Sequence, residues 1–378
     1  MVVLGMFGPG ANSGSCLLVN GKLKSLIVKT AESNFDVYVF ITGMHNDQKY
    51  GNTYLEVQRV KNVSFNRFDN KTDETTMDLT VSKTIYGFSK YVEKIKPDLI
   101  VVHGDRPEPL ACSIVGSFKN ILVAHVEGGE VSGTIDELIR HSISKLSHIH
   151  FVSNERAKER LVQMGENKKS IFIIGSPDVD LMFSKDLPMI KEAREKYEID
   201  FEQYAICLFH PVTTEAKYII SQTKCLVDSI IESEKNYIII YPNNDLGSNT
   251  IIDEYNKINS NKIKILPSIR FEYFLTILKN SDFIIGNSSA GIREAPYYSI
   301  YSINLGSRQH KRDMNTMIIN ADFEKKEILQ AINKATEKTN KKSIRNFGRG
   351  NSSELFLKTL LDDNLWKTNN QKEFHDIE

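Results

Sequence analysis

The sequence lacks the features of a membrane-bound, secreted or nucleic-acid-binding protein. No apolar run reaches the roughly 18–20 residues that a membrane-spanning helix needs, and the first residues carry no basic segment typical of a signal peptide. The 48 Lys and Arg residues balance the 48 Asp and Glu residues, which argues against a protein that coats a polyanion, although a local basic pocket remains compatible with it. We therefore expect no membrane or nucleic-acid partner.

Motifs for redox, metal and cofactor chemistry are absent as well. Cys16, Cys112, Cys207 and Cys225 are scattered and form no CxxC pair, which indicates a reduced, cytoplasmic protein. The chain contains no GxxxxGK[ST] loop, no HExxH and no Cys/His cluster with the spacing of metal ligands. We therefore expect neither a metal nor a cofactor.

Buried strands alternating with helices are the main pattern that is present. Continuous apolar, β-branched runs suit strands that are covered on both faces, and their alternation with helical segments predicts parallel α/β sheets. At 378 residues the chain is too long for one ordinary core, and the pattern restarts after a charged helical stretch near 185–196. We expect two Rossmann-like domains that face each other across a cleft. The candidate strands are 36–42, 99–103, 122–126, 149–152, 171–174, 205–209, 237–241, 262–266, 283–286 and 300–304.

Two carboxylates follow neighbouring strands of the first domain. Asp105 comes directly after the run 99–103, and Glu127 ends the run 122–126 before two glycines and Glu130. Carboxylates at adjacent strand ends suit general acid/base chemistry, because repulsion and partial burial can raise one pKa and leave the other group ionised. The alternative interpretation is a solvated loop aspartate and a glutamate at the edge of the core.

A third carboxylate opens the following helix. Thr134 and Glu137 have capping-box spacing, so Asp136 falls in the first turn, close to the loop. The apolar residues at 135, 138, 139, 143 and 146 share one face, which we expect to pack on the sheet, whereas Asp136 and Arg140 lie one turn apart on another face. Asp136 could instead be only a favourable first-turn charge.

The second domain offers residues suited to a phosphate and a ribose. His210 ends a strand and could donate a proton or bind phosphate, or be purely structural, and Asn243 lies in another strand-end turn. Gly286-Asn287-Ser288-Ser289 runs from a strand into a helix, whose free N–H groups suit a phosphate, unless the segment is a plain helix cap. Glu294 is placed to accept hydrogen bonds from a ribose diol, and Arg308 adds a basic group at the same rim.

With these motifs in view, the chain resembles the hydrolysing UDP-N-acetylglucosamine 2-epimerases of sialic acid biosynthesis, from about residue 21 to about residue 361. The non-hydrolysing branch typically has Glu-Ala-Gly-Leu-Arg where this chain has Glu127-Gly128-Gly129-Glu130, so the hydrolysing branch fits better. The matching segments are His103-Gly104-Asp105-Arg106, His125 through Asp136, His210-Pro211-Val212-Thr213-Thr214, Gly286-Asn287-Ser288-Ser289 and Arg293-Glu294.

The resemblance implies a GT-B fold and a specific reaction. Its domains would be 1–182 with the carboxylates and 183–352 with the UDP site, and a C-terminal helix, about 353–378, would return to the first. It implies anti elimination of UDP from UDP-N-acetylglucosamine to give 2-acetamidoglucal, followed by hydration to N-acetylmannosamine. The implied catalytic residues are Asp105, Glu127, Asp136 and His210. The implied substrate-binding residues are Lys22, Arg106, Glu130, Asn243, Ser288, Ser289, Glu294 and Arg308.

The start of the chain departs from the family pattern. The family begins with Thr-Gly-x-Arg near the UDP phosphates, whereas Leu17 stands at the arginine position here and Arg59 is the first arginine. The alternatives are the same chemistry on UDP-N,N'-diacetylbacillosamine in legionaminic acid synthesis, a GT-B glycosyltransferase, or a UDP-binding protein with impaired catalysis. The resemblance also implies a nucleotide-sugar partner and a homodimer or homotetramer.

Overall fold

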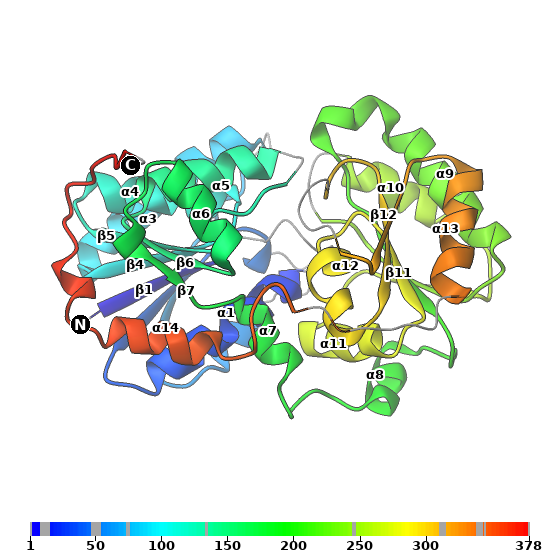
Figure 1. Ribbon diagram of the computed structural model, residues 1–378, viewed down its shortest axis with the longest axis horizontal. Coiled ribbons are helices and arrows are strands. Elements are labelled where there is room, and N and C mark those ends of the chain that lie inside the picture. The colour runs from blue at the N-terminus through cyan, green and yellow to red at the C-terminus, as the bar shows by residue number, and fades with distance from the viewer. Residues whose placement is uncertain are drawn as a thin grey trace.

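Two parallel β-sheets organise the computed structural model, which describes residues 2–7, 16–46, 54–72, 76–132, 135–243, 247–309, 315–337, 343 and 345–376. The first sheet has the strand order β3-β2-β1-β4-β5-β6-β7, and the second has β10-β9-β8-β11-β12-β13. Figure 1 shows them side by side, each covered by helices on both faces. The expected fold class, two Rossmann-like α/β domains, is therefore confirmed.

All ten expected strands are present, with ends within one residue of those predicted. They are β2 (Asp36–Ile41), β4 (Leu99–His103), β5 (Leu122–Val126), β6 (Ile149–Val152), β7 (Ile171–Ile173), β8 (Ala205–Leu208), β9 (Tyr237–Ile240), β10 (Ile263–Leu266), β11 (Phe283–Gly286) and β12 (Tyr301–Leu305).

Three further strands are not predicted from the sequence. They are β1 (Val2–Phe7), β3 (Val63–Arg67) and β13 (Ile318–Ala321). The strands β3 and β13 lie at sheet edges and carry exposed residues, so they lack the continuous apolar run that marks the inner strands. The strand β1 contains Gly5, a residue that is depleted in strands.

The helices cover the sheets and build the cores. Buried residues of α3, α4 and α5 pack on one face of the first sheet, and residues of α1 and α14 pack on the other. Two further clusters cover the faces of the second sheet. The helices are α1 (Cys16–Ala31), α2 (Tyr54–Gln58), α3 (Met77–Ile95), α4 (Pro107–Phe118), α5 (Ile135–Leu146), α6 (Glu155–Gln163), α7 (Pro177–Met182), α8 (Ile190–Tyr197), α9 (Ile219–Glu232), α10 (Ser248–Tyr255), α11 (Phe271–Lys279), α12 (Ala290–Arg293), α13 (Lys325–Glu337) and α14 (Ser352–Leu360). None of the helices in these described ranges is long and apolar enough to cross a membrane.

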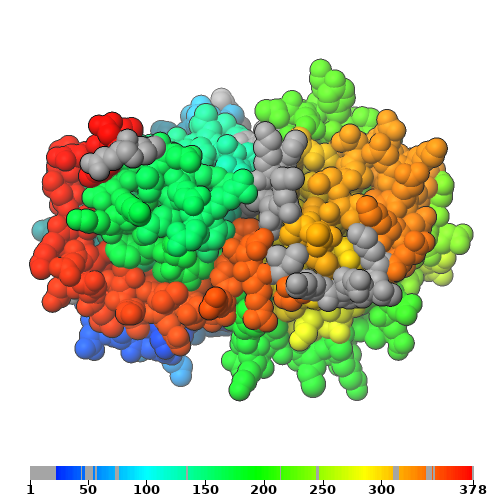
Figure 2. Space-filling view, in the orientation of Figure 1, coloured from blue at the N-terminus to red at the C-terminus, as the bar shows by residue number. Residues whose placement is uncertain are grey.

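The C-terminal segment returns to the first domain. The Phe356 ring of α14 lies 4.7 Å from the Phe151 ring of β6, and the backbone N–H of Ser352 donates to Asp180 at 2.7 Å. Beyond α14 the chain continues along the outer edge of the first domain (Figures 1 and 2). The division of the chain at residue 182 stays a prediction.

The buried face of α5 differs from the predicted one. Ile139 and Ile143 are buried as expected, but the Leu138 side chain is 63% exposed, and Asp136 and Arg140 are buried instead. Ion pairs to both charged residues offset the cost of their desolvation. The helix is therefore rotated so that its charged stripe faces the ends of the strands. Thr134 of the predicted capping box lies outside the described residues, while Glu137 accepts a hydrogen bond from the backbone of Ser132 at 2.6 Å.

Candidate active site

Asp105 and Glu127 lie at the carboxyl ends of two paired strands. The strands β4 and β5 are parallel, with His103 opposite Val126, so the residues that follow them emerge at the same edge of the sheet. Both carboxylates are buried, and the guanidinium of Arg140 on α5 forms an ion pair with Asp105. The sequence prediction that these two acids lie close to one edge holds, and neither is a solvated loop residue.

Glu127 is held by an arginine from the other domain. Arg293 of α12 donates hydrogen bonds to both carboxylate oxygens of Glu127, from Nη1 to Oε2 at 2.9 Å and from Nη2 to Oε1. The Nε2 atom of His103 lies 3.2 Å from Oε2. Burial would raise the pKa of Glu127, but the charges of Arg293 and His103 hold that pKa well below its ordinary value. Glu127 is therefore an ionised carboxylate in this arrangement.

Glu130 connects the two arginines. Its carboxylate accepts a hydrogen bond from Ser153 at 3.0 Å and lies 3.7 Å from Nη1 of Arg293, while its backbone oxygen accepts from Arg140 at 3.1 Å. Gly129 has a φ of +74°, and a Cβ there would overlap the backbone oxygen of Ala157. The loop after β5 consequently requires a glycine at this position.

Asp136 is buried and faces the second domain. Nη1 of Arg106 lies 3.4 Å from Oδ1 of Asp136, and Nη2 of Arg308 lies 3.8 Å from Oδ2. Burial lowers the pKa of Arg140, but the charges of Asp105, Glu130 and Asp136 outweigh this effect and raise the pKa above its ordinary value. Asp136 therefore belongs to the same electrostatic cluster as Asp105, and is more than a first-turn charge.

His210 is built into the second domain through Asn287. The backbone N–H of His210 donates to the Asn287 side chain at 2.7 Å, and that side chain donates back to the His210 carbonyl at 2.8 Å. The backbone N–H of Asn243 donates to Nδ1 of His210 at 3.1 Å, which places the proton of the neutral ring on Nε2. Arg308 donates to the Asn287 carbonyl at 3.2 Å. The contacts thus connect His210 through Asn287 and Arg308 to Asp136.

The loop after β11 forms one tight turn rather than the start of a long helix. Ser288, Ser289 and Glu294 are buried, but α12 contains only four residues, and Glu294 follows it at the start of a 3-10 turn that contains Pro296. The predicted helix-dipole contribution to a phosphate site is correspondingly weaker. A Cβ at Gly286 would overlap the backbone oxygen of Leu208, so the strand end requires a glycine.

The structure places further residues, which are not among the predicted site residues, in contact with the acids, and it leaves one predicted residue untested. Arg140, Arg293, His103, Ser176 and Asp178 all contact the predicted acids or each other. Arg140 has a sequence signal in its i, i+4 spacing from Asp136, and His103 and Arg293 stand in segments that match the family, whereas Ser176 and Asp178 have no such signal. Lys22 lies in α1, but its side chain is outside the described residues, as is that of Leu17, which stands at the arginine position of the family's first motif.

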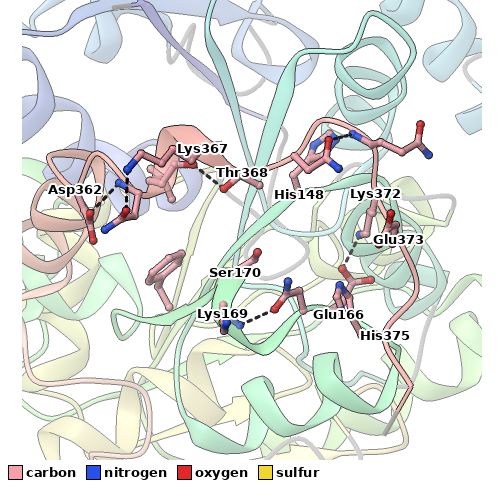
Figure 3. A pocket seen from close by; sticks show the side chains of 16 residues that line it. His148, Glu166, Lys169, Ser170, Asp362, Lys367, Thr368, Lys372, Glu373 and His375 are labelled. Carbon is pink, nitrogen blue, oxygen red and sulfur yellow. Dashed lines mark hydrogen bonds and ion pairs between the residues drawn. The ribbon is translucent and has the colours of Figure 1, made fainter.

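Two cavities of similar size differ in their relation to this cluster. One, of about 410 Å³, includes Glu130, Val131, Arg160 and Phe347 in its lining and so adjoins the acids. The other, of about 440 Å³, lies between the segment after α6 and the C-terminal segment (Figure 3). This second cavity lies near the amino ends of β6 and β7, the edge opposite to the one where open α/β sheets bind ligands.

Comparisons with known proteins give a consistent result. A family model described as UDP-N-acetylglucosamine 2-epimerase matches residues 29–361. A UDP-N-acetylglucosamine 2-epimerase of Neisseria meningitidis serogroup B is 44% identical over 361 residues, which cover 94% of this chain and 96% of the relative. A UDP-N,N'-diacetylbacillosamine 2-epimerase (hydrolyzing) of Legionella pneumophila is 33% identical, covering 90% of this chain and 93% of the relative.

A solved structure supports the fold. The UDP-GlcNAc 2-epimerase of Methanocaldococcus jannaschii, crystallised with UDP-GlcNAc and UDP, superposes with a TM-score of 0.80 at 22% identity, covering 95% of this chain and 98% of that one. At this identity the likeness shows the architecture alone, which is the expected GT-B arrangement of two Rossmann-like domains.

Proposed function

Because the chain belongs to the UDP-N-acetylglucosamine 2-epimerase family, we propose that it is a hydrolysing 2-epimerase that converts UDP-N-acetylglucosamine to N-acetylmannosamine and UDP. The observation that carries the proposal is the cluster of buried carboxylates, Asp105, Glu127 and Asp136, at the carboxyl edge of the first sheet. Arginines of the second domain reach two of these carboxylates, so the cluster faces the domain proposed to hold UDP.

The reaction proceeds in two steps that the cluster is suited to serve. A carboxylate removes the proton from C2 of the sugar while the C1–O bond to UDP breaks, which leaves 2-acetamidoglucal. Water then adds its oxygen to C1, and a proton returns to C2 on the opposite face. The C2 proton is only weakly acidic, so stabilising the departing diphosphate contributes directly to the rate.

The second domain supplies the groups for the leaving diphosphate. His210, with its proton on Nε2, is suited to donate a hydrogen bond to a phosphate oxygen or to protonate it. The Oγ of Ser289 is buried and has no hydrogen-bond partner among the described residues, which suits a group that binds a ligand. The proposed substrate-binding residues are Lys22, Arg106, Glu130, Asn243, Ser288, Ser289, Glu294 and Arg308.

The loop after β5 supports the hydrolysing branch. Glu130 and Val131 stand where the non-hydrolysing motif has Leu and Arg. The Glu130 carboxylate is anchored by Ser153, and Val131 lines the cavity next to it. A second acid in place of a leucine gives the site a further group that can orient water, and the missing arginine removes one charge that could retain UDP.

Incubation of the enzyme with UDP-N-acetylglucosamine in D2O tests the chemistry. We expect N-acetylmannosamine that carries deuterium at C2, because the proton that returns to C2 comes from solvent-exchanged groups. Product without label at C2 would overturn the elimination mechanism. Transfer of the sugar to an acceptor with no exchange at C2 would favour a GT-B glycosyltransferase, and tight UDP binding without turnover would favour a UDP-binding protein.

A second substrate is supported by the Legionella relative, whose name specifies UDP-N,N'-diacetylbacillosamine. The same carboxylates could carry out the same elimination on that sugar, since the acetamido group at C2 is common to both. Comparing kcat/KM for UDP release from the two nucleotide sugars separates them. We expect UDP-N-acetylglucosamine to be preferred, and a higher value for the bacillosamine derivative would reassign the substrate.

The biological setting is proposed on the family resemblance. We propose a cytoplasmic homodimer or homotetramer that supplies N-acetylmannosamine for sialic acid biosynthesis. Its domains would be residues 1–182, with the carboxylates, and 183–352, with the UDP site. The contacts of α14 with α1 and α7 support the assignment of the C-terminal helix to the first domain.

A further inference from the structure

Arg293 belongs to the second domain, but its side chain lies among acids of the first. It is 2% exposed, binds Glu127 through both terminal nitrogens, lies 3.3 Å from the Asp178 carboxylate and 3.7 Å from that of Glu130. The guanidinium carbon lies 5.3 Å from the centre of the Phe347 ring. The side chain therefore occupies a prepared site on the opposite domain.

Three acids around Glu127, counting Glu127 itself, share the single guanidinium of Arg293. Within the described residues, the charged or titratable groups that contact this carboxylate are Arg293 from α12 and His103 from the end of β4, and Ser176 donates a hydrogen bond to it. Glu130 and Asp178 share the same guanidinium. Burial lowers the pKa of Arg293, but these three acids raise it well above its ordinary value. Arg293 is thus permanently charged, and Glu127 receives its bidentate contact, the strongest geometry available to a guanidinium and a carboxylate.

Arg293 is rigidly connected to the proposed UDP loop. Its backbone N–H donates to the carbonyl of Ser289 at 2.8 Å, and the next N–H, of Glu294, donates to Ala290 at 3.2 Å. One turn of backbone therefore holds the proposed phosphate ligand Ser289, the proposed ribose ligand Glu294 and the arginine that reaches the other domain. The same turn that would bind the nucleotide therefore also fixes the position of Glu127 relative to it, through Arg293.

We propose that Arg293 is a positioning residue of the reaction, which fixes the orientation and the charge of Glu127 from the nucleotide-binding turn of the second domain. This inference rests on the proposed function. Glu127 then takes part in the reaction as an ionised carboxylate. Glu127 is positioned to accept a proton only when Arg293, and with it the turn proposed to bind UDP, is in place.

A second ion pair between the domains provides a matched control. Nζ of Lys24 on α1 lies 2.9 Å from Glu272 on α11, with the Lys24 side chain 41% exposed. This pair also joins the two domains, but it contacts none of the proposed site residues whose side chains the structure describes. If the loss of any ion pair between the domains lowered turnover, Lys24→Met would lower it as well.

The test compares Arg293→Gln, Arg293→Lys, Glu127→Gln, the double variant Arg293→Gln/Glu127→Gln and Lys24→Met. For Arg293→Gln we expect kcat to fall about 100-fold and the acidic limb of its pH profile to move up by about 1–3 units, because burial then raises the pKa of Glu127 with less opposition. The Kd for UDP, measured by calorimetry, should change by less than about threefold, because the proposed UDP ligands are intact.

The double variant should be no slower than Glu127→Gln, and the kcat of Lys24→Met should stay within about twofold of wild type.

Arg293→Lys keeps the charge and loses the bidentate contact, so we expect an unshifted pH profile and a kcat about tenfold lower. A wild-type pH profile in Arg293→Gln, or effects of Arg293→Gln and Glu127→Gln on kcat that multiply in the double variant, would overturn the inference.

NMR of 13C-labelled glutamate measures the pKa of Glu127 without turnover, and the spectrum of Glu127→Gln identifies its resonance. If wild type makes no product but this pKa rises in Arg293→Gln, the proposed function fails and the charge coupling stands; an unchanged pKa would overturn the coupling.

Discussion

Two buried ionic clusters lie at opposite edges of the first sheet, and they are composed in opposite ways. At the carboxyl edge, Glu127, Glu130 and Asp178 share Arg293. At the amino edge, one acid, Glu166, contacts two ammonium groups and an imidazole: Lys145 at 2.8 Å, Lys372 at 2.6 Å and Nε2 of His150 at 2.9 Å. Around Arg293, three acids share one guanidinium, whereas Glu166 alone faces two lysine ammonium groups.

The amino-edge cluster fastens the C-terminal segment to the domain. Lys372 donates to the carbonyls of Ser144 and Ser147 at the end of α5, at 2.9 and 2.5 Å, and its ammonium reaches Glu166 (Figure 3). His148 donates from Nε2 to the carbonyl of Asn370 at 3.1 Å. Here each charge has partners within the protein, so the cluster is suited to stability. The comparison teaches that acids of the first domain meeting an arginine of the second, rather than burial of charge as such, mark the candidate site.

The largest expected effect comes from neutralising an acid at the carboxyl edge. We expect Asp105→Asn, Glu127→Gln and Asp136→Asn each to lower kcat by about 10²–10⁴-fold, because an amide cannot exchange the required proton. The variants should remain folded, with a lower melting temperature because each change weakens a buried ion pair. UDP release measured beside a thermal melt checks both, and a variant with a kcat within tenfold of wild type removes that residue from the proposed chemistry.

The loop between Glu127 and Glu130 should tolerate no side chain at its second glycine. Gly129→Ala places a Cβ against the backbone oxygen of Ala157 at a φ of +74°, and we expect a loss of about 3 kcal/mol in the free energy of unfolding, with a lower kcat. Gly104 is the matched control, since its φ is +78° but a Cβ there meets nothing within 4 Å. Gly104→Ala should lose only about 1 kcal/mol. Equal losses in denaturant unfolding would show that strain alone, and not the overlap, sets the cost.

Removing the acid of the amino-edge cluster should affect stability and spare turnover. Burial opposes ionisation of Glu166, but His150, Lys372 and Lys145 lower its pKa from 4.5 to about 2. At pH 7 we expect Glu166→Gln to lose about 2 kcal/mol of unfolding free energy and to keep kcat within about twofold.

The pH dependence of that loss follows from the sign of the pKa shift. A carboxylate with a lowered pKa in the folded protein stabilises it above pH 4.5, and this contribution disappears as the pH falls through the folded value near 2. The stability gap between wild type and Glu166→Gln should therefore narrow between pH 4.5 and 2, as measured by urea unfolding. A gap that does not change with pH would mean that Glu166 contributes by packing alone.

The smallest effect is expected for the exposed member of the amino-edge cluster. The side chain of Lys145 is 41% exposed, so water replaces much of its ion pair, and Lys145→Met should cost less than about 1 kcal/mol. Lys372→Met, whose side chain is 22% exposed, should cost more. The opposite order in chemical denaturation would contradict the view that the C-terminal segment depends on Lys372.

Sequence patterns were sufficient for ten strands and for the meeting of Asp105 with the Glu127 loop, because parallel strands bring their carboxyl ends to one edge. They were insufficient for β1, for the edge strands β3 and β13, which carry exposed residues, and for the buried face of α5. That face is set by ion pairs to Asp136 and Arg140 rather than by apolar periodicity. The contact of Arg293 with Glu127 spans 166 residues and crosses between domains, so no local pattern contains it.

The identity of the sugar product tests the central claim most directly. Wild-type protein incubated with UDP-N-acetylglucosamine and followed by 1H and 31P NMR should yield UDP and free N-acetylmannosamine in equal amounts. Accumulation of UDP-N-acetylmannosamine without free sugar would contradict the account, because it would show that the site returns UDP to the intermediate rather than adding water.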